Sequence, residues 1–292
     1  MSFHLAGIVP VAGQKLDFNM PWHDCLMPIA RDFLAVERAV LECAYAGCET
    51  IWIVCNDDMQ PLIRHRIGEY LNDPVWTHRH FERDKKGHQK RIPVQYVPIH
   101  PKDRNKRDCL SWSVLYGAHI SNKVSGALSA WLKPDRFYVA FPFGVYDYWL
   151  PREFRKQISS NKSFFFEHQG KTVVDGEYLG FTFDMETCLL LMSEVRKKST
   201  GIFVDEERRQ KLALDERFSY RNFTLKQVFD SLPSDNSNVH SLEEYYNIDN
   251  WDNYCDYISS RGKEHRSIPK SVLKYKEWNE IGLDDYIILE DS

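Results

Sequence analysis

Residues that suit phosphate binding follow the first apolar run of the chain. The run LAGIVPVAG ends at Gly13, and Gln14 and Lys15 come next. A glycine turn after a strand can present backbone N–H groups to phosphate oxygens, and a nearby ammonium group adds a favourable charge. The segment is therefore a candidate phosphate-binding loop. A tight turn beside a solvated lysine is the open alternative.

A second basic segment, PKDRNKRD, lies between an expected strand and an expected helix. Arg104 and Arg107 suit bidentate capture of phosphate, Lys102 adds a third positive charge, and the start of the next helix contributes its dipole. These three side chains are candidate phosphate ligands. An ordinary charged surface loop is the alternative.

Asn56, Asp57 and Asp58 follow another apolar run, TIWIVC. Asp57 is a candidate contact to a base or ribose. Asn and Asp also commonly cap the helix that begins at such a place, and capping is the favoured interpretation.

Two other patterns carry weaker chemical signals. His78 and His80, with His88 and His100 nearby, would lie on one face of a strand, as metal ligands must, but no convincing third ligand accompanies the pair. A polar surface strip is therefore the favoured interpretation. Ser111 lacks the G-x-S-x-G surroundings of a nucleophile, so hydrolase chemistry is unsupported.

The elements that position these residues begin with one βαβ unit. Strands within 5–13 and 50–55 flank the segment 26–48, which has apolar residues at helical spacing and which Gly47 is expected to cap. Such a unit implies parallel pairing and a right-handed crossover. Ligands bind beyond the carboxyl ends of strands in open sheets, so 13–24 and 55–58 should border a site.

The same alternation continues along the chain. Patterning predicts helices over 57–71, 110–124, 154–160 and 185–198, and strands over 91–100, 136–147, 163–173 (a pair) and 176–184. Residues 1–198 are therefore predicted to form an α/β domain with a mixed, mostly parallel sheet sandwiched by helices. Residues 199–292 form a polar and aromatic C-terminal extension in this prediction, partly packed back on the sheet through 245–258.

Composition argues against several classes of protein. A chain of 292 residues with 43% hydrophobic content can bury a sizeable core, and its net charge of −4 disfavours a bulk nucleic-acid or membrane binder. No apolar run is long enough to span a membrane. The seven cysteines form no CxxC pair, which predicts reduced core thiols in a cytoplasmic protein.

The order of elements resembles the nucleotide-diphospho-sugar transferase (GT-A-like) superfamily, and most closely its sugar-phosphate nucleotidyltransferase branch. The segment AYAGCETIWIVCND is similar to the branch's second strand, and YYNIDNWDNY looks like its Trp/Tyr-rich C-terminal element. The resemblance covers roughly residues 4–190 and 245–258 by order and spacing. It implies a GT-A-like, Rossmann-type fold.

The resemblance also implies a function. A protein of this branch binds a nucleotide or nucleotide-sugar and joins a nucleoside triphosphate to a sugar phosphate or similar acceptor. Lys15 would then act on the triphosphate, and Asp249 and Asp147 would hold Mg²⁺, with Asp184 in reserve.

Three departures from the branch pattern leave other functions open. The phosphate loop VAGQK keeps one glycine, PWHD replaces the usual Pro-Lys pair, and the strand FPFGVYD offers one aspartate rather than an Asp-x-Asp pair. A glycosyltransferase on the same scaffold, or a catalytically silent structural or interaction protein, are the alternatives.

Overall fold

The protein folds around an eight-stranded sheet in the order β13-β9-β10-β7-β1-β4-β6-β5. The computed structural model describes residues 3–15, 17–75, 90–104, 107–201, 204–205, 210–211, 223–232 and 237–260. The strands of the sheet are β1 (Leu5–Pro10), β4 (Thr50–Val54), β5 (Tyr70–Asn72), β6 (Arg91–Val97), β7 (Arg136–Val139), β9 (Phe164–Glu167), β10 (Phe181–Phe183) and β13 (Asn238–Ser241).

The pairing is mixed and mostly parallel, as predicted. β1 lies between β4 and β7 and is parallel to both, β4 is parallel to β6, and β13 is parallel to β9. β10 and the edge strand β5 run antiparallel to their neighbours. The fold class predicted from the sequence is therefore confirmed.

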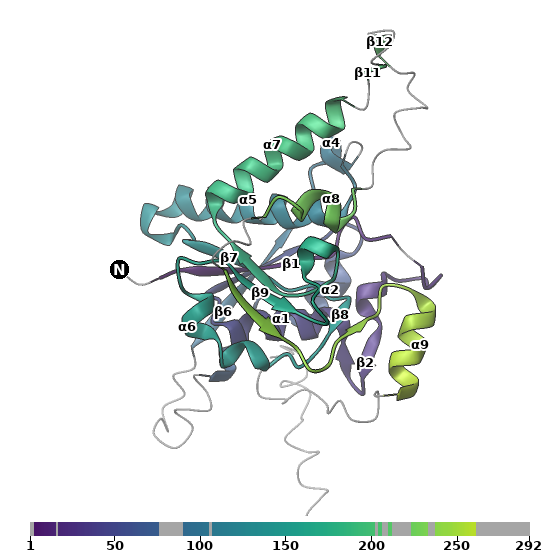
Figure 1. The fold of residues 1–292 in the computed structure, drawn as a ribbon. Helices are drawn as coiled ribbons and strands as arrows, with labels where there is room; N and C mark the ends of the chain where they lie inside the picture. Colours follow the sequence, from purple (N-terminus) through teal and green to yellow (C-terminus); the bar gives the residue numbers. More distant parts are fainter. Residues whose placement is uncertain are drawn as a thin grey trace, which may run out of the picture.

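Helices cover both faces of this sheet. Figure 1 shows α5, α7 and α8 over one face and α1 and α6 over the other. The helices are α1 (Ala35–Ala46), α2 (Gln60–Ile67), α4 (Pro101–Arg104), α5 (Leu110–Leu128), α6 (Arg155–Ile158), α7 (Met185–Gly201), α8 (Leu225–Phe229) and α9 (Trp251–Ser260). An ion pair between Arg66 on α2 and Glu37 on α1 ties α2 to the side of α1.

Smaller elements complete the described chain. Three two-stranded pairs are β2 (Pro28–Ala30) with β3 (Phe33–Leu34), β8 (Gly144–Val145) with β14 (Tyr246–Asn247), and β11 (Val204–Asp205) with β12 (Gln210–Lys211). The short 3-10 turns are η1 (Asp24–Leu26), η2 (Ala130–Leu132), η3 (Leu150–Arg152) and η4 (Val173–Asp175).

The predicted βαβ unit is present as β1, α1 and β4. All six residues of β1 are buried, as expected for a central parallel strand covered on both faces. Gly47 ends α1 in the left-handed conformation, with a φ of 96°, and its N–H bonds the carbonyls of Cys43 and Ala44. Gly7 lets α1 approach β1, because a Cβ there would lie 2.8 Å from the Cys43 Sγ.

Three predicted boundaries are wrong. A β2–β3 hairpin precedes α1, and the positive φ of Asp32 (57°) makes its turn. The predicted helix over 57–71 is the eight-residue α2, followed after Gly68 by the edge strand β5. The predicted strand over 136–147 is interrupted after β7, and its last part is the separate strand β8. Short strands with few residues give a weak periodic signal, so neighbouring structure decides these boundaries.

Among the residues that the structure describes, no helix combines the length and apolarity needed to cross a membrane.

Candidate functional site

The loop after β1 is held at the carboxyl edge of the sheet. The N–H groups of Val11 and Ala12 both donate to the Val54 carbonyl at the end of β4, each at 2.9 Å. The Ser113 hydroxyl on α5 donates to the Ala12 carbonyl. The loop is thus fixed between β4 and the first turn of α5.

Gly13 is required for this placement. Its φ is +80°, and a Cβ added there would lie 2.4 Å from the carbonyl carbon of Cys109. The residue therefore permits both a left-handed turn and close contact with the residue that precedes α5. Gln14 and Lys15 follow at the surface, with the Lys15 side chain exposed.

The Tyr178 hydroxyl joins this loop to the C-terminal element. The Gln14 side chain lies close enough to that hydroxyl to favour its charged form, and the hydroxyl donates to Asp249 Oδ2 at 3.5 Å. Burial, with the negative charge of Asp249 second, raises the pKa of Tyr178 to about 12, so its hydroxyl stays protonated at neutral pH. Two predicted site residues, far apart in the sequence, are therefore brought together by a third.

Asp249 owes its position to an added strand pair. β14 pairs antiparallel with β8, and the Ile248 N–H donates to the Phe143 carbonyl at 2.9 Å. Asp249 is the next residue, so it lies beside the segment that follows β7. The Asn247 side chain accepts the Asp249 N–H at 3.0 Å and fixes the turn into α9.

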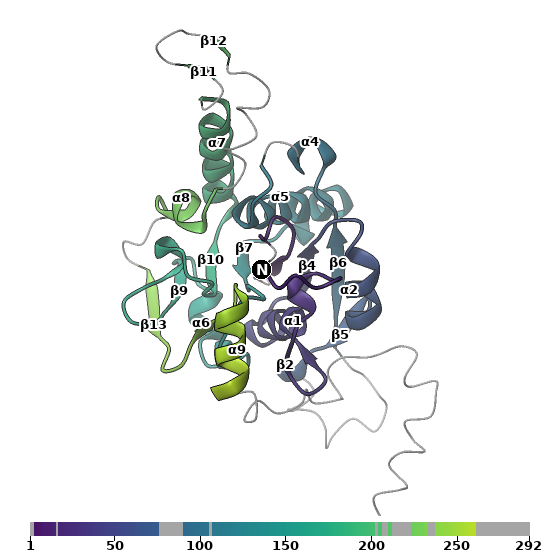
Figure 2. The same cartoon turned by 90° about the vertical axis from the view of Figure 1, so that its right-hand side faces the viewer.

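A second contact links the first loop to α9. Asp17 Oδ2 accepts the Trp251 N–H at 3.0 Å, where it caps the start of α9. Phe18 packs against the rings of Trp251 and Tyr254, at 5.6 and 5.1 Å between centroids. Figure 2 looks onto this edge of the molecule, where α9 and α4 both border the ends of the parallel strands.

The basic segment after β6 also reaches this edge, but its arginines have protein partners. Arg104 Nη2 contacts Asp57 Oδ2 at 2.8 Å, and its Nε donates to the Ile99 carbonyl at 3.1 Å. Two predicted ligand contacts therefore neutralise each other across the ends of β4 and β6.

Arg107 is held even more firmly. It pairs with Asp103 at 2.5 Å and its guanidinium lies 4.8 Å from the centre of the Trp112 ring. Burial lowers the pKa of Arg107, and Asp103 opposes that effect. Lys102 remains exposed on α4, where its N–H bonds His100 Nδ1 at 3.2 Å. Of the three basic candidates, Lys102 is the one whose side chain makes no hydrogen bond or ion pair within the described structure.

Asp147 and Asp249 do not lie together. β8 and β14 run antiparallel, with Val145 opposite Tyr246 and Gly144 opposite Asn247. Asp147 and Asp249 therefore leave this pair at opposite ends, and the exposed Asp147 enters the turn before η3. The structure does not form the two-carboxylate arrangement expected for Mg²⁺ at this place.

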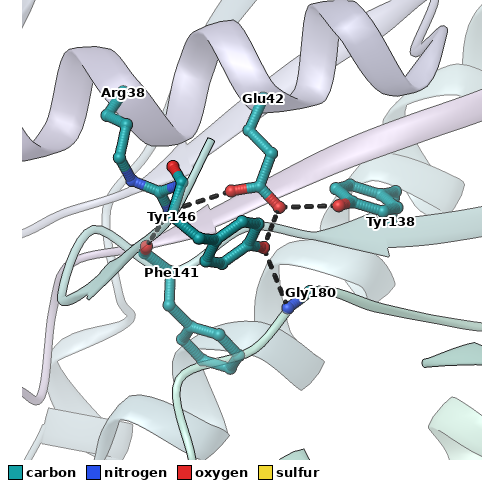
Figure 3. Close-up of polar contacts among 6 residues, drawn as sticks. All are labelled: Arg38, Glu42, Tyr138, Phe141, Tyr146 and Gly180. Carbon is teal, nitrogen blue, oxygen red and sulfur yellow. Dashed lines mark hydrogen bonds and ion pairs between the residues drawn. The ribbon is translucent and has the colours of Figure 1, made fainter. Parts of the chain in front are cut away.

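Beneath the site lies a sealed polar cluster on α1, shown in Figure 3. Arg38 pairs with Glu42 at 2.8 Å and donates to the Phe141 carbonyl at 2.8 Å. Glu42 accepts hydrogen bonds from the hydroxyls of Tyr138, at 2.6 Å, and Tyr146. Arg38 also donates to the Tyr146 carbonyl at 3.4 Å, so α1 holds both the segment that follows β7 and the residue that follows β8.

The cluster also contacts the segment that carries Tyr178. The Tyr146 hydroxyl accepts the Gly180 N–H at 3.1 Å, two residues after Tyr178. Burial raises the pKa of Glu42, while Arg38 and the two tyrosine hydroxyls favour its charged form. The segments that carry Phe143 and Tyr178 are therefore anchored to the same buried ion pair.

Sequence comparison finds no matching family model and no matching curated protein. Solved structures do match over nearly the whole chain. The UTP-bound UGPase of Acinetobacter baumannii superposes with a TM-score of 0.53 at 13% identity, over 96% of this chain and 98% of that one. A UDP-glucose pyrophosphorylase from the same organism gives 0.51 at 15% identity, over 97% and 99%.

A third structure, a Bacillus anthracis protein named as a glucose-1-phosphate thymidylyltransferase in complex with sucrose, gives 0.51 at 9% identity, over 90% and 98%. The chain has the nucleotide-diphospho-sugar transferase fold. The resemblance stated from the order of elements is confirmed at the level of the fold.

Within this fold, the sequence did not single out Tyr178, which bridges Gln14 and Asp249. It lies in a segment predicted as a strand, and a tyrosine there carries no chemical signal of its own. The predicted histidines His78, His80 and His88 lie outside the described residues, as does most of the predicted extension over 199–292. The part of the chain that the structure does describe holds no group of three or more His, Cys, Asp or Glu side chains placed to bind a metal ion.

Proposed function

We propose that this protein binds a nucleotide and transfers a nucleotidyl group from a nucleoside triphosphate to a sugar phosphate or similar acceptor. The observation that carries the proposal is the chain Gln14–Tyr178–Asp249. It joins the loop after β1 to the C-terminal carboxylate at the edge where open α/β sheets bind ligands. The named activities of the structural neighbours, UDP-glucose pyrophosphorylase and glucose-1-phosphate thymidylyltransferase, support this class of reaction.

In this proposal the loop Gly13–Gln14–Lys15 cradles the triphosphate. Lys15 is the exposed cation at this loop, whereas Arg104 binds the ligand only if it exchanges Asp57 for a phosphate. Asp249 is suited to one Mg²⁺ contact, because Mg²⁺ is commonly held by one or two carboxylates together with substrate phosphates. The ion would screen charge between attacking and transferred groups, while the protein positions them.

The direct test is calorimetry with UTP, dTTP and UDP-glucose, each with and without MgCl₂, followed by an assay of pyrophosphate release from UTP and glucose 1-phosphate. Lys15→Ala should weaken UTP binding about tenfold, because it removes a charge-assisted contact. Lys133→Ala is the matched control, since Lys133 is exposed next to η2, before β7 begins. Equal affinities for the Lys15 and Lys133 variants would exclude the assigned loop.

The second candidate is a nucleotide-binding protein without catalytic activity. The observation that favours it is the separation of Asp147 from Asp249, together with the pairing of Arg104 with Asp57. UTP binding without pyrophosphate release from any sugar phosphate would select this candidate. Release of UDP from UDP-glucose would instead select a glycosyltransferase. A cytoplasmic location remains the expectation from the cysteine pattern.

A further inference from the structure

His23 stands in the segment PWHD, where the branch usually has its Pro-Lys pair. It immediately precedes η1, and its Nδ1 accepts the Cys25 N–H at 3.1 Å. A ring nitrogen that accepts a hydrogen bond carries no proton, so the proton of the neutral imidazole lies on Nε2.

The imidazole is neutral at physiological pH. Burial lowers the pKa of His23 to about 4, and the negative charge of Asp58 opposes this only in part. The position therefore offers one N–H donor and no positive charge, whereas a lysine would offer an ammonium group.

His23 is linked to Tyr178 through the ring of Phe143. Its ring centroid is 6.4 Å from that of Phe143, which in turn lies 5.9 Å from the ring of Tyr178. On the other side are Asp58, which follows β4, and Cys25, whose thiol lies near that of Cys55. The residue thus lies between the end of β4 and the segment that carries Phe143, whose carbonyl accepts the Ile248 N–H.

The Nε2 donor is available to a ligand. The side chain is more than nine-tenths buried, and its one hydrogen bond within the described structure is made by Nδ1. Nε2 makes no hydrogen bond within the described structure. A buried ring with one nitrogen fixed and the other without a protein partner is a preorganised donor.

We propose that His23 Nε2–H donates a hydrogen bond to an uncharged oxygen of the bound ligand, a carbonyl of the base or a hydroxyl of a sugar. This inference rests on the proposed nucleotide-binding function and adds a specificity-determining residue to it. An uncharged acceptor fits because the Asp58 carboxylate acts on His23 and the acidic Asp24 is the next residue. A phosphate placed there would face these carboxylates without a compensating cation.

Two substitutions separate ligand recognition from the local fold. In His23→Asn, the amide oxygen can replace Nδ1 as acceptor for the Cys25 N–H, and the Nε2 donor is lost. In His23→Gln, the amide nitrogen can replace the Nε2 donor, and the contact with Cys25 is lost. The probes are UDP-glucose and inorganic pyrophosphate, each with MgCl₂, measured by calorimetry on the full chain, with melting temperatures recorded for all variants.

His23→Asn should bind UDP-glucose about 3- to 10-fold more weakly than the wild type, which corresponds to one hydrogen bond, and should keep the wild-type melting temperature. His23→Gln should bind within about twofold of the wild type even where it melts lower. Pyrophosphate affinity should be the same for all three proteins.

If His23 had only a structural role, His23→Gln would bind UDP-glucose more weakly than the wild type and His23→Asn would bind it normally. That result would overturn the inference. An equal loss of pyrophosphate affinity in His23→Asn would also overturn it, because the donor would then face a phosphate. Wild-type protein that binds neither UTP, dTTP nor UDP-glucose would remove the proposed function and this inference with it. Wild-type binding with an unaffected His23→Asn variant would remove the inference alone.

Discussion

The buried Arg38–Glu42 pair is the residue-scale feature on which the site's geometry depends. Both side chains are at most 1% exposed, and the charged groups gain their partners from three different segments of the chain. Buried ion pairs are costly to form because both ions lose water, yet removing one partner leaves an uncompensated charge. We therefore expect the pair to matter more for placing the β7–β8 connection than for net stability.

Glu42→Gln measures the cost of removing one partner of the pair. The substitution keeps the shape and an acceptor for the tyrosine hydroxyls but leaves Arg38 buried without a counter-charge, so it should lower the free energy of unfolding by about 3–5 kcal/mol. Urea titration followed by circular dichroism measures this loss. The control is Glu69→Gln, because Glu69 pairs with Arg64 at the surface, with side chains 62% and 50% exposed. Its cost should stay below about 1 kcal/mol, and equal costs would contradict a special role for the buried pair.

His23 makes a pH-dependent contribution whose sign follows from its pKa. The folded pKa is about 4 and the unfolded value is 6.5, so between these values the unfolded chain binds more protons. The contribution of His23 to the free energy of unfolding is therefore fully present above pH 6.5, and it is lost as the pH falls toward 4. The contribution is about 3 kcal/mol at about 1.4 kcal/mol per pKa unit.

His23→Asn should accordingly lose less stability than the wild type between pH 7 and pH 4. Urea unfolding at matched pH values measures the difference, and other titrating groups cancel because both proteins share them. If the free energy of unfolding of the two proteins changed equally with pH, His23 would not be held neutral by burial.

At the scale of elements, the loop after β1 is defined by its close approach to α5. Gly13→Ala should destabilise the protein by about 2–4 kcal/mol, because the left-handed conformation and the overlap with Cys109 backbone both oppose a Cβ. Gly170→Ala is the matched control: its φ is +76°, but nothing lies within 4 Å of the added Cβ. Gly170→Ala should lower the free energy of unfolding by about 1 kcal/mol, because it pays only for the left-handed backbone conformation. Thermal unfolding of both variants measures the difference, and similar costs would mean that the loop moves away from α5.

The elements themselves were predictable where the hydrophobic pattern is long. The run of β1, the helical spacing before Gly47 and the nineteen residues of α5 each bury a face that the sequence displays. The interruption between β7 and β8 was not predictable, because the chain stays apolar through Phe141 and Phe143 while it leaves the sheet. Arg38, Glu42 and two tyrosines fix that departure through contacts between distant segments, and pattern alone does not reveal such contacts.

The candidate site was likewise predictable only in part. Gly13, Gln14 and Asp249 follow recognisable strands or motifs, and the structure brings Gln14 and Asp249 together. The charge balance of the site was not predictable, because it depends on pairings such as Arg104 with Asp57 that span two strand ends. A basic segment in a sequence therefore indicates charge available to a ligand only once the positions of the nearby acidic residues are known.

At the scale of the whole molecule, the accessibility of the seven cysteines measures how well the core between the sheet and its helices is protected from solvent. Six are buried and Cys255 on α9 is partly exposed. Burial raises the pKa of Cys25 and Cys43, and it raises that of Cys55 and Cys188 to about 12, so these thiols stay protonated and unreactive in the folded protein.

Titration of the native protein with a chromogenic disulfide reagent should therefore label Cys255 quickly and the other six slowly, with all seven labelled at once in denaturant. The slow rate should follow global unfolding, because the buried thiols lie on several elements of one core. Cys255→Ser should abolish the fast phase and leave the slow one unchanged. Several fast thiols in Cys255→Ser would instead show that part of the core opens independently of the remainder.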